Sequence, residues 1–211
     1  MTDGPLVAVL DYGIGNLRSA QKALQRMGAD ARLTADRGLV GDAAGIVLPG
    51  VGAFGRCLEA LHESGLTDIA GEAAADASAG GRPFLGICVG MQMLFDGSDE
   101  SPGSKGLGVI EGRVERLAGD VKRPQMQWNR LDMTGSGALF AGLQDGAWMY
   151  FVHGYAAPVG PTTVATCDYG TTLCAAVRRG NLWGVQFHPE KSGGTGLKVL
   201  SNFVGSLPGG A

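Results

Sequence analysis

Short continuous apolar runs, separated by helical patterns, fill the first half of the chain. Residues 6–10 are all apolar, which is typical of a strand buried on both faces. Apolar residues then recur at helical spacing over residues 17–27, with Asn16 as the expected N-cap and Gly28 as a stop signal. Similar patterns predict strands at residues 31–34, 45–48 and 83–87, and helices at residues 54–64, 66–77 and 89–95.

Strand-like segments prevail in the second half. They are expected at residues 109–117, 128–133, 147–152, 162–167, 172–178 and 182–187, with a closing helix at residues 196–207. Arg179-Gly180-Asn181 is a hairpin signal, which makes the last two strands antiparallel. Strand–helix alternation over the first 95 residues implies a parallel, doubly wound sheet. The sequence therefore predicts a single α/β domain over residues 1–211, in which the second half adds antiparallel strands to a mostly parallel central sheet.

Composition and charge restrict the class of protein. Hydrophobic residues make up 45% of the chain, and 17 basic and 20 acidic residues give a net charge of −3. Both signs are scattered along the chain, which argues against a nucleic-acid-binding or membrane-surface protein. The longest apolar run, residues 84–95, is too short to span a bilayer, and residues 1–5 carry no signal-peptide pattern. We therefore expect a cytoplasmic protein.

One of the four cysteines lies in a pattern typical of a catalytic nucleophile. The four form no C-x-x-C pair, so neither a zinc site nor a redox pair is expected. Cys88, however, lies in Gly86-Ile87-Cys88-Val89-Gly90, directly after a predicted buried strand. This is the G-x-nucleophile-x-G pattern of a nucleophile elbow, whose glycines permit a sharp strand-to-helix turn and whose helix start favours a thiolate. The alternative is a small buried cysteine in a glycine-rich turn.

A thiol nucleophile needs a base, and the chain contains three histidines: His62, His153 and His188. His62 falls in a predicted surface helix. His188 ends a predicted strand, and Pro189 disfavours a helical conformation at His188. In an extended segment His188 and Glu190 point to the same side, so Glu190 is placed to orient the imidazole as the third member of a triad. A metal site at H-x-E is disfavoured, since no further ligand lies at suitable spacing nearby.

Acyl transfer also needs hydrogen-bond donors for the oxyanion. Pro49-Gly50-Val51-Gly52 follows a predicted parallel strand, where backbone N–H groups can turn into the crevice at the carboxyl ends of the strands. The N–H of Val89, directly after the nucleophile, is the second expected donor. A plain turn over residues 49–52 is the alternative.

Five longer strings occur in order along the chain: Asp11-Tyr12-Gly13-Ile14-Gly15-Asn16-Leu17, Pro49-Gly50-Val51-Gly52, Gly86-Ile87-Cys88-Val89-Gly90-Met91-Gln92, Tyr150-Phe151-Val152-His153 and Gly184-Val185-Gln186-Phe187-His188-Pro189-Glu190-Lys191-Ser192. Together they resemble the glutaminase subunits of imidazole glycerol phosphate synthases, which are class I (triad-type) glutamine amidotransferases. The resemblance covers nearly the whole chain. The lysine after H-P-E and the D-Y-G-x-G-N start separate it from the GMP-, anthranilate- and carbamoyl-phosphate-type glutaminases. A flavodoxin-like α/β fold is implied.

The resemblance also implies an activity and a partner. The family hydrolyses glutamine to glutamate and passes ammonia to a cyclase subunit, a (β/α)₈ barrel, within a heterodimer. That complex makes imidazole glycerol phosphate and an aminoimidazole carboxamide ribotide in histidine biosynthesis, and no cofactor or metal is implied. Position by position, the implied roles are Cys88 as nucleophile, His188 as general base and acid, Glu190 as its orienter, Val51, Gly52 and Val89 as backbone oxyanion donors, Gly50 and Gln92 as substrate contacts, and Trp128, Asn129 and Lys191 as residues facing the cyclase.

The chain departs from the family pattern at three positions. Gln125 and Gln127 stand where the family has a histidine and a glycine, and Gly154 stands where it has a serine or threonine. These departures concern coupling to the partner and affinity for glutamine, and none touches the triad. The alternatives are the glutaminase subunit of another ammonia-using synthase, a catalytically silent regulatory subunit and, more weakly, a cysteine peptidase with a similar elbow.

Overall fold

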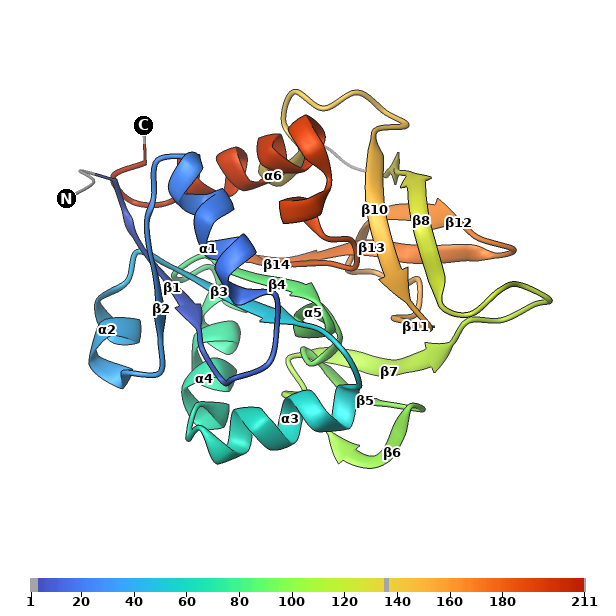
Figure 1. Cartoon of the computed structure of the whole chain (residues 1–211), viewed down its shortest axis with the longest axis horizontal. Helices are drawn as coiled ribbons and strands as arrows, with labels where there is room; N and C mark the ends of the chain where they lie inside the picture. Colours follow the sequence, from blue (N-terminus) through green and yellow to red (C-terminus); the bar gives the residue numbers. More distant parts are fainter. Residues whose placement is uncertain (1–3, 135–136, 211) are drawn as a thin grey trace.

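A central eight-stranded sheet forms the middle layer of the computed structural model, which describes residues 4–134 and 137–210. Its strand order is β2-β1-β3-β4-β14-β13-β12-β9 (Figure 1). The mutually parallel strands are β1 (Leu6–Leu10), β2 (Asp30–Thr34), β3 (Gly45–Gly50), β4 (Phe84–Cys88) and β14 (Leu182–Val185). The antiparallel additions are β13 (Thr172–Arg179), β12 (Thr163–Asp168) and β9 (Asp132–Met133). The predicted fold class, a mostly parallel sheet with antiparallel strands added by the second half, is confirmed.

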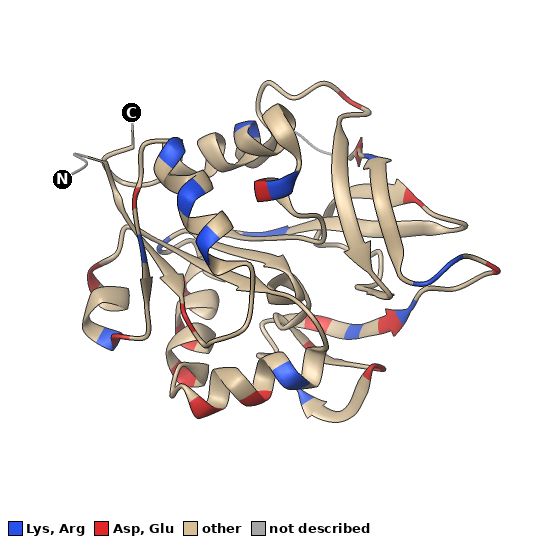
Figure 2. Ribbon diagram, in the orientation of Figure 1, with Lys and Arg blue, Asp and Glu red and all other residues tan. Residues whose placement is uncertain are grey.

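Helices cover both faces of this sheet. Figure 1 shows α1 (Leu17–Arg26) and α6 (Gly193–Gly205) on one face, and α3 (Phe54–Glu63) and α4 (Thr67–Ser78) on the other. The short α2 (Arg37–Asp42) connects β2 to β3. The helices pack on the sheet through their apolar residues, and the buried residues of α4 are all alanines: Ala70, Ala73, Ala74 and Ala77. Their outer faces are charged, with basic residues on α1 and mainly acidic residues on α3 and α4 (Figure 2).

Two smaller sheets lie beside the central one. β10 (Trp148–His153) pairs with β8 (Gln125–Arg130) in an antiparallel arrangement, here called the β8–β10 ribbon. The second small sheet has the order β11-β7-β5-β6 and consists of β11 (Tyr155–Ala156), β7 (Ile110–Arg116), β5 (Phe95–Ser98) and β6 (Ser101–Lys105). The ribbon is tied to the end of β14, because the His188 N–H donates to the Tyr150 carbonyl oxygen at 2.9 Å.

The predicted elements differ from the structure in a few places. The helix after Cys88 is α5 (Val89–Gln92), shorter than residues 89–95, because Phe95 pairs with Ile110 in β7. The predicted strand 128–133 is divided between β8 and β9, which belong to different sheets. Asn16 precedes α1, but its side chain accepts from the Ser19 hydroxyl at 2.7 Å instead of capping a backbone N–H. One α-helix and three strands that the pattern does not predict, α2, β5, β6 and β11, are short or contain glycine, and two 3₁₀ helices, Ala138–Phe140 and Pro189–Lys191, are also unpredicted.

The buried apolar side chains form one contiguous cluster, which extends from β1 through the central sheet to α6. Six phenylalanines are fully buried in it: Phe54, Phe84, Phe95, Phe151, Phe187 and Phe203. None of the described helices is both long enough and apolar enough to cross a membrane.

Candidate active site

Cys88 stands at the carboxyl end of β4, where the chain turns sharply into α5. Its backbone has φ 55° and ψ −113°, and it is the only described non-glycine residue with a positive φ. Such a conformation costs about 1–3 kcal/mol and is found mainly at functional sites. Gly90 permits the turn, because a β-carbon there would lie 1.8 Å from the Leu48 carbonyl oxygen. The sharp strand-to-helix turn expected from the glycine spacing is therefore present.

His188 and Glu190 follow β14 and lie in contact. His188 Nδ1 is 2.9 Å from Glu190 Oε1, and each side chain is 2% exposed. The predicted contact between His188 and Glu190 is present, but the prediction that an extended backbone from His188 to Glu190 produces it is wrong. His188 itself is extended, at φ −101° and ψ 94°, whereas the next three residues form a 3₁₀ turn, η2 (Pro189–Lys191). This turn folds Glu190 back onto the imidazole.

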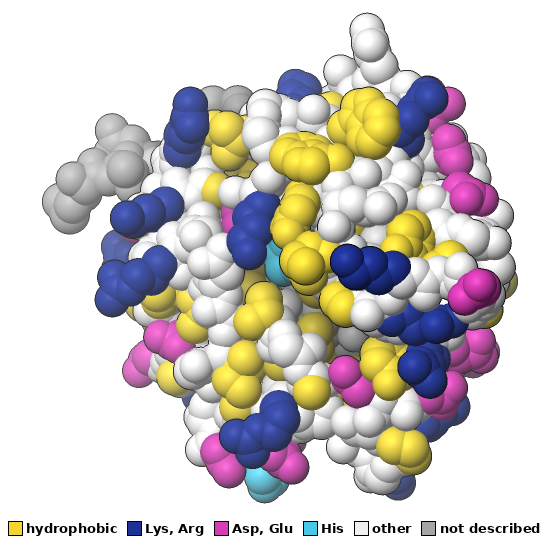
Figure 3. All heavy atoms as spheres, turned by 45° about the vertical axis from the view of Figure 1, so that its right-hand side comes forward, with side chains coloured by type: hydrophobic (Ala, Val, Ile, Leu, Met, Phe, Trp, Pro, Cys, Tyr) yellow, Lys and Arg dark blue, Asp and Glu magenta, His cyan; other side chains and the backbone are white. Residues whose placement is uncertain are grey.

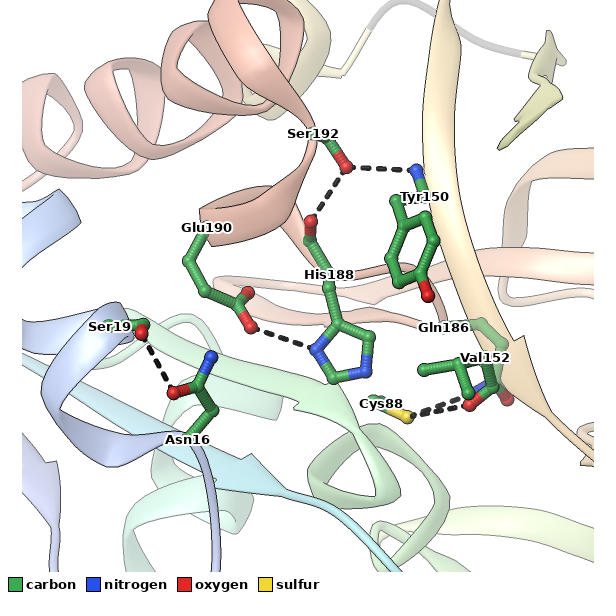
Figure 4. Close-up of polar contacts among 9 residues, drawn as sticks. All are labelled: Asn16, Ser19, Cys88, Tyr150, Val152, Gln186, His188, Glu190 and Ser192. Atoms are coloured by element: carbon green, nitrogen blue, oxygen red, sulfur yellow. Dashed lines mark hydrogen bonds and ion pairs between the residues drawn. The ribbon is translucent and has the colours of Figure 1, made fainter. Parts of the chain in front are cut away.

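Ser192, which the sequence pattern does not single out, fixes the backbone of His188 (Figure 4). Its hydroxyl donates to the His188 carbonyl oxygen at 2.6 Å and accepts the Tyr150 N–H at 3.0 Å. The segment after β14 is thereby joined to the β8–β10 ribbon, which fixes the backbone from which the imidazole extends. The available signal was the four-residue spacing from His188, which corresponds to about one helical turn.

The imidazole of His188 lies over the sulfur of Cys88 (Figure 4). Its Nε2 makes no hydrogen bond to any residue within 4–134 or 137–210. Burial lowers the pKa of His188, but the neighbouring Cys88 and Glu190 together outweigh burial and raise the pKa to about 9. His188 is therefore protonated at neutral pH when it faces a thiolate.

Gln186 contacts Cys88, and Gln92 in turn contacts Gln186. Gln186 Nε2 donates to Cys88 Sγ at 3.6 Å, and Gln186 Oε1 accepts from Gln92 Nε2 at 2.9 Å. Gln92 Nε2 also donates to the Tyr155 carbonyl oxygen at 3.0 Å. An N–H donor at this place can hydrogen-bond a negatively charged sulfur. The sequence pattern does not single out Gln186, although it lies two residues before His188 and so on the same face of an extended segment.

Cys88, Gln92 and His188 border a cavity of about 390 Å3. Most of the predicted functional residues line it: Val51, Gly52, Cys88, Val89, Gln92, His188 and Lys191. Gly50 lies behind the wall instead, where a β-carbon would be 2.7 Å from the Gly90 nitrogen. Trp128 and Asn129 lie on β8, away from the cavity lining, and Asn129 Nδ2 donates to the Asp168 carbonyl oxygen at 2.8 Å.

Two further polar residues of the cavity have no role in the sequence-based prediction. Glu100, between β5 and β6, accepts the Phe54 N–H at 2.8 Å, which holds a carboxylate on the cavity wall. His153 is 6% exposed, and its Nδ1 lies 2.8 Å from the Tyr155 carbonyl oxygen. Nδ1 therefore carries the ring proton, which leaves Nε2 as an acceptor. Burial lowers the pKa of His153 to about 4, so the ring is neutral at pH 7.

The three positions that depart from the family pattern have different surroundings. Gln125 is fully buried opposite His153 in the β8–β10 ribbon, and its amide has no hydrogen-bond partner among the described residues. Gln127 is exposed. Gly154 lines the cavity, and a β-carbon there would have no atom within 4 Å. Its backbone is not in the left-handed region, so a side chain would cause no backbone strain.

No three His, Cys, Asp or Glu side chains of the described part of the chain are placed to hold a metal ion together.

Comparison with known proteins decides the family. A family model described as glutamine amidotransferase class-I matches residues 8–206. The chain belongs to the class I glutamine amidotransferases. Within this family it is 47% identical to imidazole glycerol phosphate synthase subunit HisH of Deinococcus radiodurans, over 94% of this chain and 93% of that protein. It is 48% identical to the subunit HisH of Halobacterium salinarum, over 95% of this chain and 93% of that protein.

Solved structures show the same amidotransferase fold. A glutamine amidotransferase crystal structure superimposes with a TM-score of 0.68 at 24% identity, over 94% of this chain and 98% of that one. PurLQS from Thermotoga maritima gives a TM-score of 0.68 at 21% identity, over 95% of this chain and 97% of that one. The resemblance drawn from the five sequence strings is confirmed, and the HisH relatives favour this branch of the class I amidotransferases over the glutaminase of another synthase.

Proposed function

We propose that this chain is the glutaminase subunit of an imidazole glycerol phosphate synthase, and that it hydrolyses glutamine with Cys88, His188 and Glu190. The observation that carries the proposal is the strained Cys88 beneath an imidazole that Glu190 holds at 2.9 Å, on the wall of one cavity. The HisH relatives support both the reaction and its place in histidine biosynthesis. We take residues 1–211 as one domain, a proposal that the contiguous core supports.

The first half-reaction forms a thioester. The Cys88 thiolate attacks the side-chain amide carbon of glutamine, and the carbonyl oxygen takes up the negative charge. Protonated His188 donates its Nε2 proton to the amide nitrogen, the C–N bond breaks and ammonia leaves. A glutamyl thioester on Cys88 and a neutral imidazole remain.

The second half-reaction uses the same imidazole as a base. Acylation removes the charge on the sulfur, and with it part of the interaction that raises the pKa of His188. Neutral His188 then takes a proton from water, the resulting hydroxide attacks the thioester, and the C–S bond breaks to release glutamate and the thiolate. Glu190 accepts from Nδ1 in both halves and stabilises each imidazolium.

Backbone N–H groups of Val51, Gly52 and Val89 supply donors for the oxyanion in this proposal. All three residues line the cavity. Loss of one such donor typically lowers a rate by about 10²–10³. Rotation of the Val51 N–H into the cavity, when the partner holds its own substrate, would therefore switch the glutaminase on.

Glutamine itself is recognised through charge and shape. Glu100 is the only carboxylate among the described residues that line the cavity, so it is placed to pair with the substrate α-ammonium group. Gln92 lines the same cavity, but its amide N–H groups donate to the Tyr155 carbonyl oxygen and to Gln186 Oε1, both within the chain. We propose that Gln92 shapes the pocket through these contacts as well as touching the substrate.

The β8–β10 ribbon supports a docking surface for the partner. Met126, Trp128 and Trp148 are 62%, 46% and 53% exposed on it, and such large exposed apolar side chains are typical of interfaces. Figure 3 shows hydrophobic side chains gathered across this face. The same ribbon supplies Val152 and His153 to the cavity wall, so a partner on the ribbon also covers the site. We propose that this partner is the (β/α)₈ cyclase subunit, which takes up the ammonia, and that Trp128, Asn129 and Lys191 face it.

The proposal is tested by glutamate release from glutamine, measured with and without the cognate cyclase subunit. The wild-type complex should release glutamate, and Cys88→Ala should release none while its cyclase still works with added ammonium salt. Glutamate release by Cys88→Ala would refute the assigned nucleophile. A wild-type complex that released no glutamate would indicate a catalytically silent subunit.

A further inference from the structure

Residues 49–52 are here called the oxyanion strand. Two buried side chains hold its backbone on either side of one peptide unit, Gly50–Val51. The Tyr12 hydroxyl donates to the Pro49 carbonyl oxygen at 2.5 Å. The Cys57 thiol donates to the Val51 carbonyl oxygen at 3.2 Å. These two carbonyls belong to the peptide units immediately before and after the Gly50–Val51 unit. The anchors therefore flank the unit whose N–H belongs to Val51.

Both anchors are buried side chains that remain donors at neutral pH. Tyr12 follows β1 and is 4% exposed, and Cys57 lies fully buried in α3. Burial raises the pKa of the Tyr12 hydroxyl and of the Cys57 thiol, so both keep their protons. A protonated hydroxyl or thiol that faces a carbonyl oxygen acts as the donor.

The residues between the anchors allow one kind of movement. A single peptide unit rotates when ψ of the residue before it and φ of the residue after it change in opposite senses, and the neighbouring units then stay in place. Gly50 supplies the first of these angles with the freedom of a glycine. The carbonyls of Pro49 and Val51, in contrast, lose a hydrogen bond if their own units rotate.

We propose that Tyr12 and Cys57 are positioning residues that confine movement of the oxyanion strand to the Gly50–Val51 peptide unit. The proposal rests on the proposed function, in which the Val51 N–H is an oxyanion donor. With both flanking units fixed, a signal from the partner changes the direction of one N–H group and leaves the rest of the strand in place. Without either anchor, the strand samples several arrangements, with or without the partner.

Conformational exchange at the backbone amides, measured by NMR, tests the anchors directly. ¹⁵N relaxation dispersion on the whole chain should show added microsecond-to-millisecond exchange at Gly50 in Tyr12→Phe, because the Pro49–Gly50 unit is released. Cys57→Ala should instead add exchange at Gly52, because the Val51–Gly52 unit is released. Cys57→Ser, whose hydroxyl can donate to the Val51 carbonyl, should keep the wild-type pattern. Cys174→Ala, at an equally buried cysteine in β13, is the control.

Kinetics provide a second readout that a purely structural role would not move. A neutral hydrogen bond is worth a factor of about 2–12 in an equilibrium constant. The ratio of partner-stimulated to basal kcat for glutamine should fall by about 2–12-fold in Tyr12→Phe and in Cys57→Ala. The KM for glutamine should stay near the wild-type value, and Cys57→Ser should restore the ratio.

The outcomes separate the two proposals. The anchor proposal is wrong if the wild-type complex releases glutamate but neither Tyr12→Phe nor Cys57→Ala changes the conformational exchange measured at Gly50 or Gly52. It is also wrong if basal and stimulated kcat fall together at a constant ratio. If Cys57→Ala does not fold, the Tyr12→Phe spectra decide alone. Failure of the wild-type complex to release glutamate overturns the proposed function instead.

Discussion

Replacing Gly154 by serine is the change whose consequence the structure defines most closely. Gly154 lines the cavity between His153 and Tyr155, and the family pattern has a serine or threonine there. A β-carbon on Gly154 meets nothing within 4 Å, and the backbone there is not left-handed. The serine therefore fits without strain, and its hydroxyl is added to the wall of the glutamine site.

The expected effect is tighter binding of glutamine. One neutral hydrogen bond contributes about 0.5–1.5 kcal/mol, or a factor of about 2–12. Gly154→Ser should lower the KM for glutamine within that range and leave kcat nearly unchanged, because the bond is made equally in the ground state and the transition state. If the position faces the partner instead, the KM stays constant and the dissociation constant of the cyclase shifts.

Steady-state kinetics, a cyclase titration and a melting curve on this variant test the reasoning. Gly160→Ser is the matched control, since Gly160 is exposed, meets nothing within 4 Å and does not line this cavity. Both variants should melt at or slightly above the wild-type temperature, because serine reduces the entropy of the unfolded chain. A marked loss of stability in Gly154→Ser would contradict the structural argument, and unchanged values in all three assays would show that position 154 has neither role.

Other predictions concern the two buried histidines and Glu190. His188→Asn should lose nearly as much glutaminase kcat as Cys88→Ala, since members of one catalytic unit are not additive, and near-normal turnover would exclude the triad. Glu190→Gln should lose less kcat than His188→Asn, because Glu190 orients the ring without transferring a proton; the same kinetic assay ranks them. Burial lowers the pKa of His153 to about 4, so the unfolded chain binds a proton between pH 6.5 and pH 4 that the folded chain does not. The free energy of unfolding that is present above pH 6.5 is therefore lost as the pH falls towards 4, by about 2 kcal/mol between pH 7 and pH 4.5. Urea unfolding at the two pH values should show a smaller loss in His153→Gln than in the wild type.

The sequence predicts those parts of the site that depend on local chemistry. The glycines around Cys88 define its turn by their spacing alone, and the structure has the turn. The His188–Glu190 contact was predicted for a reason that is only half right. Proline keeps His188 extended but does not decide the conformation after itself, and the 3₁₀ turn there brings Glu190 to the ring.

Contacts between distant segments could not be predicted from spacing. Gln186 reaches Cys88 across 98 positions of sequence, and Glu100 accepts the Phe54 N–H across 46. The first contact arises from the order of strands in the sheet, which places β14 beside β4, and the second from the position of α3 beside the separate sheet that contains β5 and β6. The short β5 and β6, which carry Glu100 between them, have no hydrophobic periodicity to reveal them.

The covalent intermediate tests the central claim most directly. The wild-type complex is mixed with radiolabelled glutamine, quenched in acid within one turnover, and digested for peptide mapping. The account predicts label on the peptide that contains Cys88, sensitive to hydroxylamine as a thioester should be, and no label in Cys88→Ala. Label on another peptide, or glutamate release at the wild-type rate by Cys88→Ala, would contradict the assignment of Cys88 as the nucleophile.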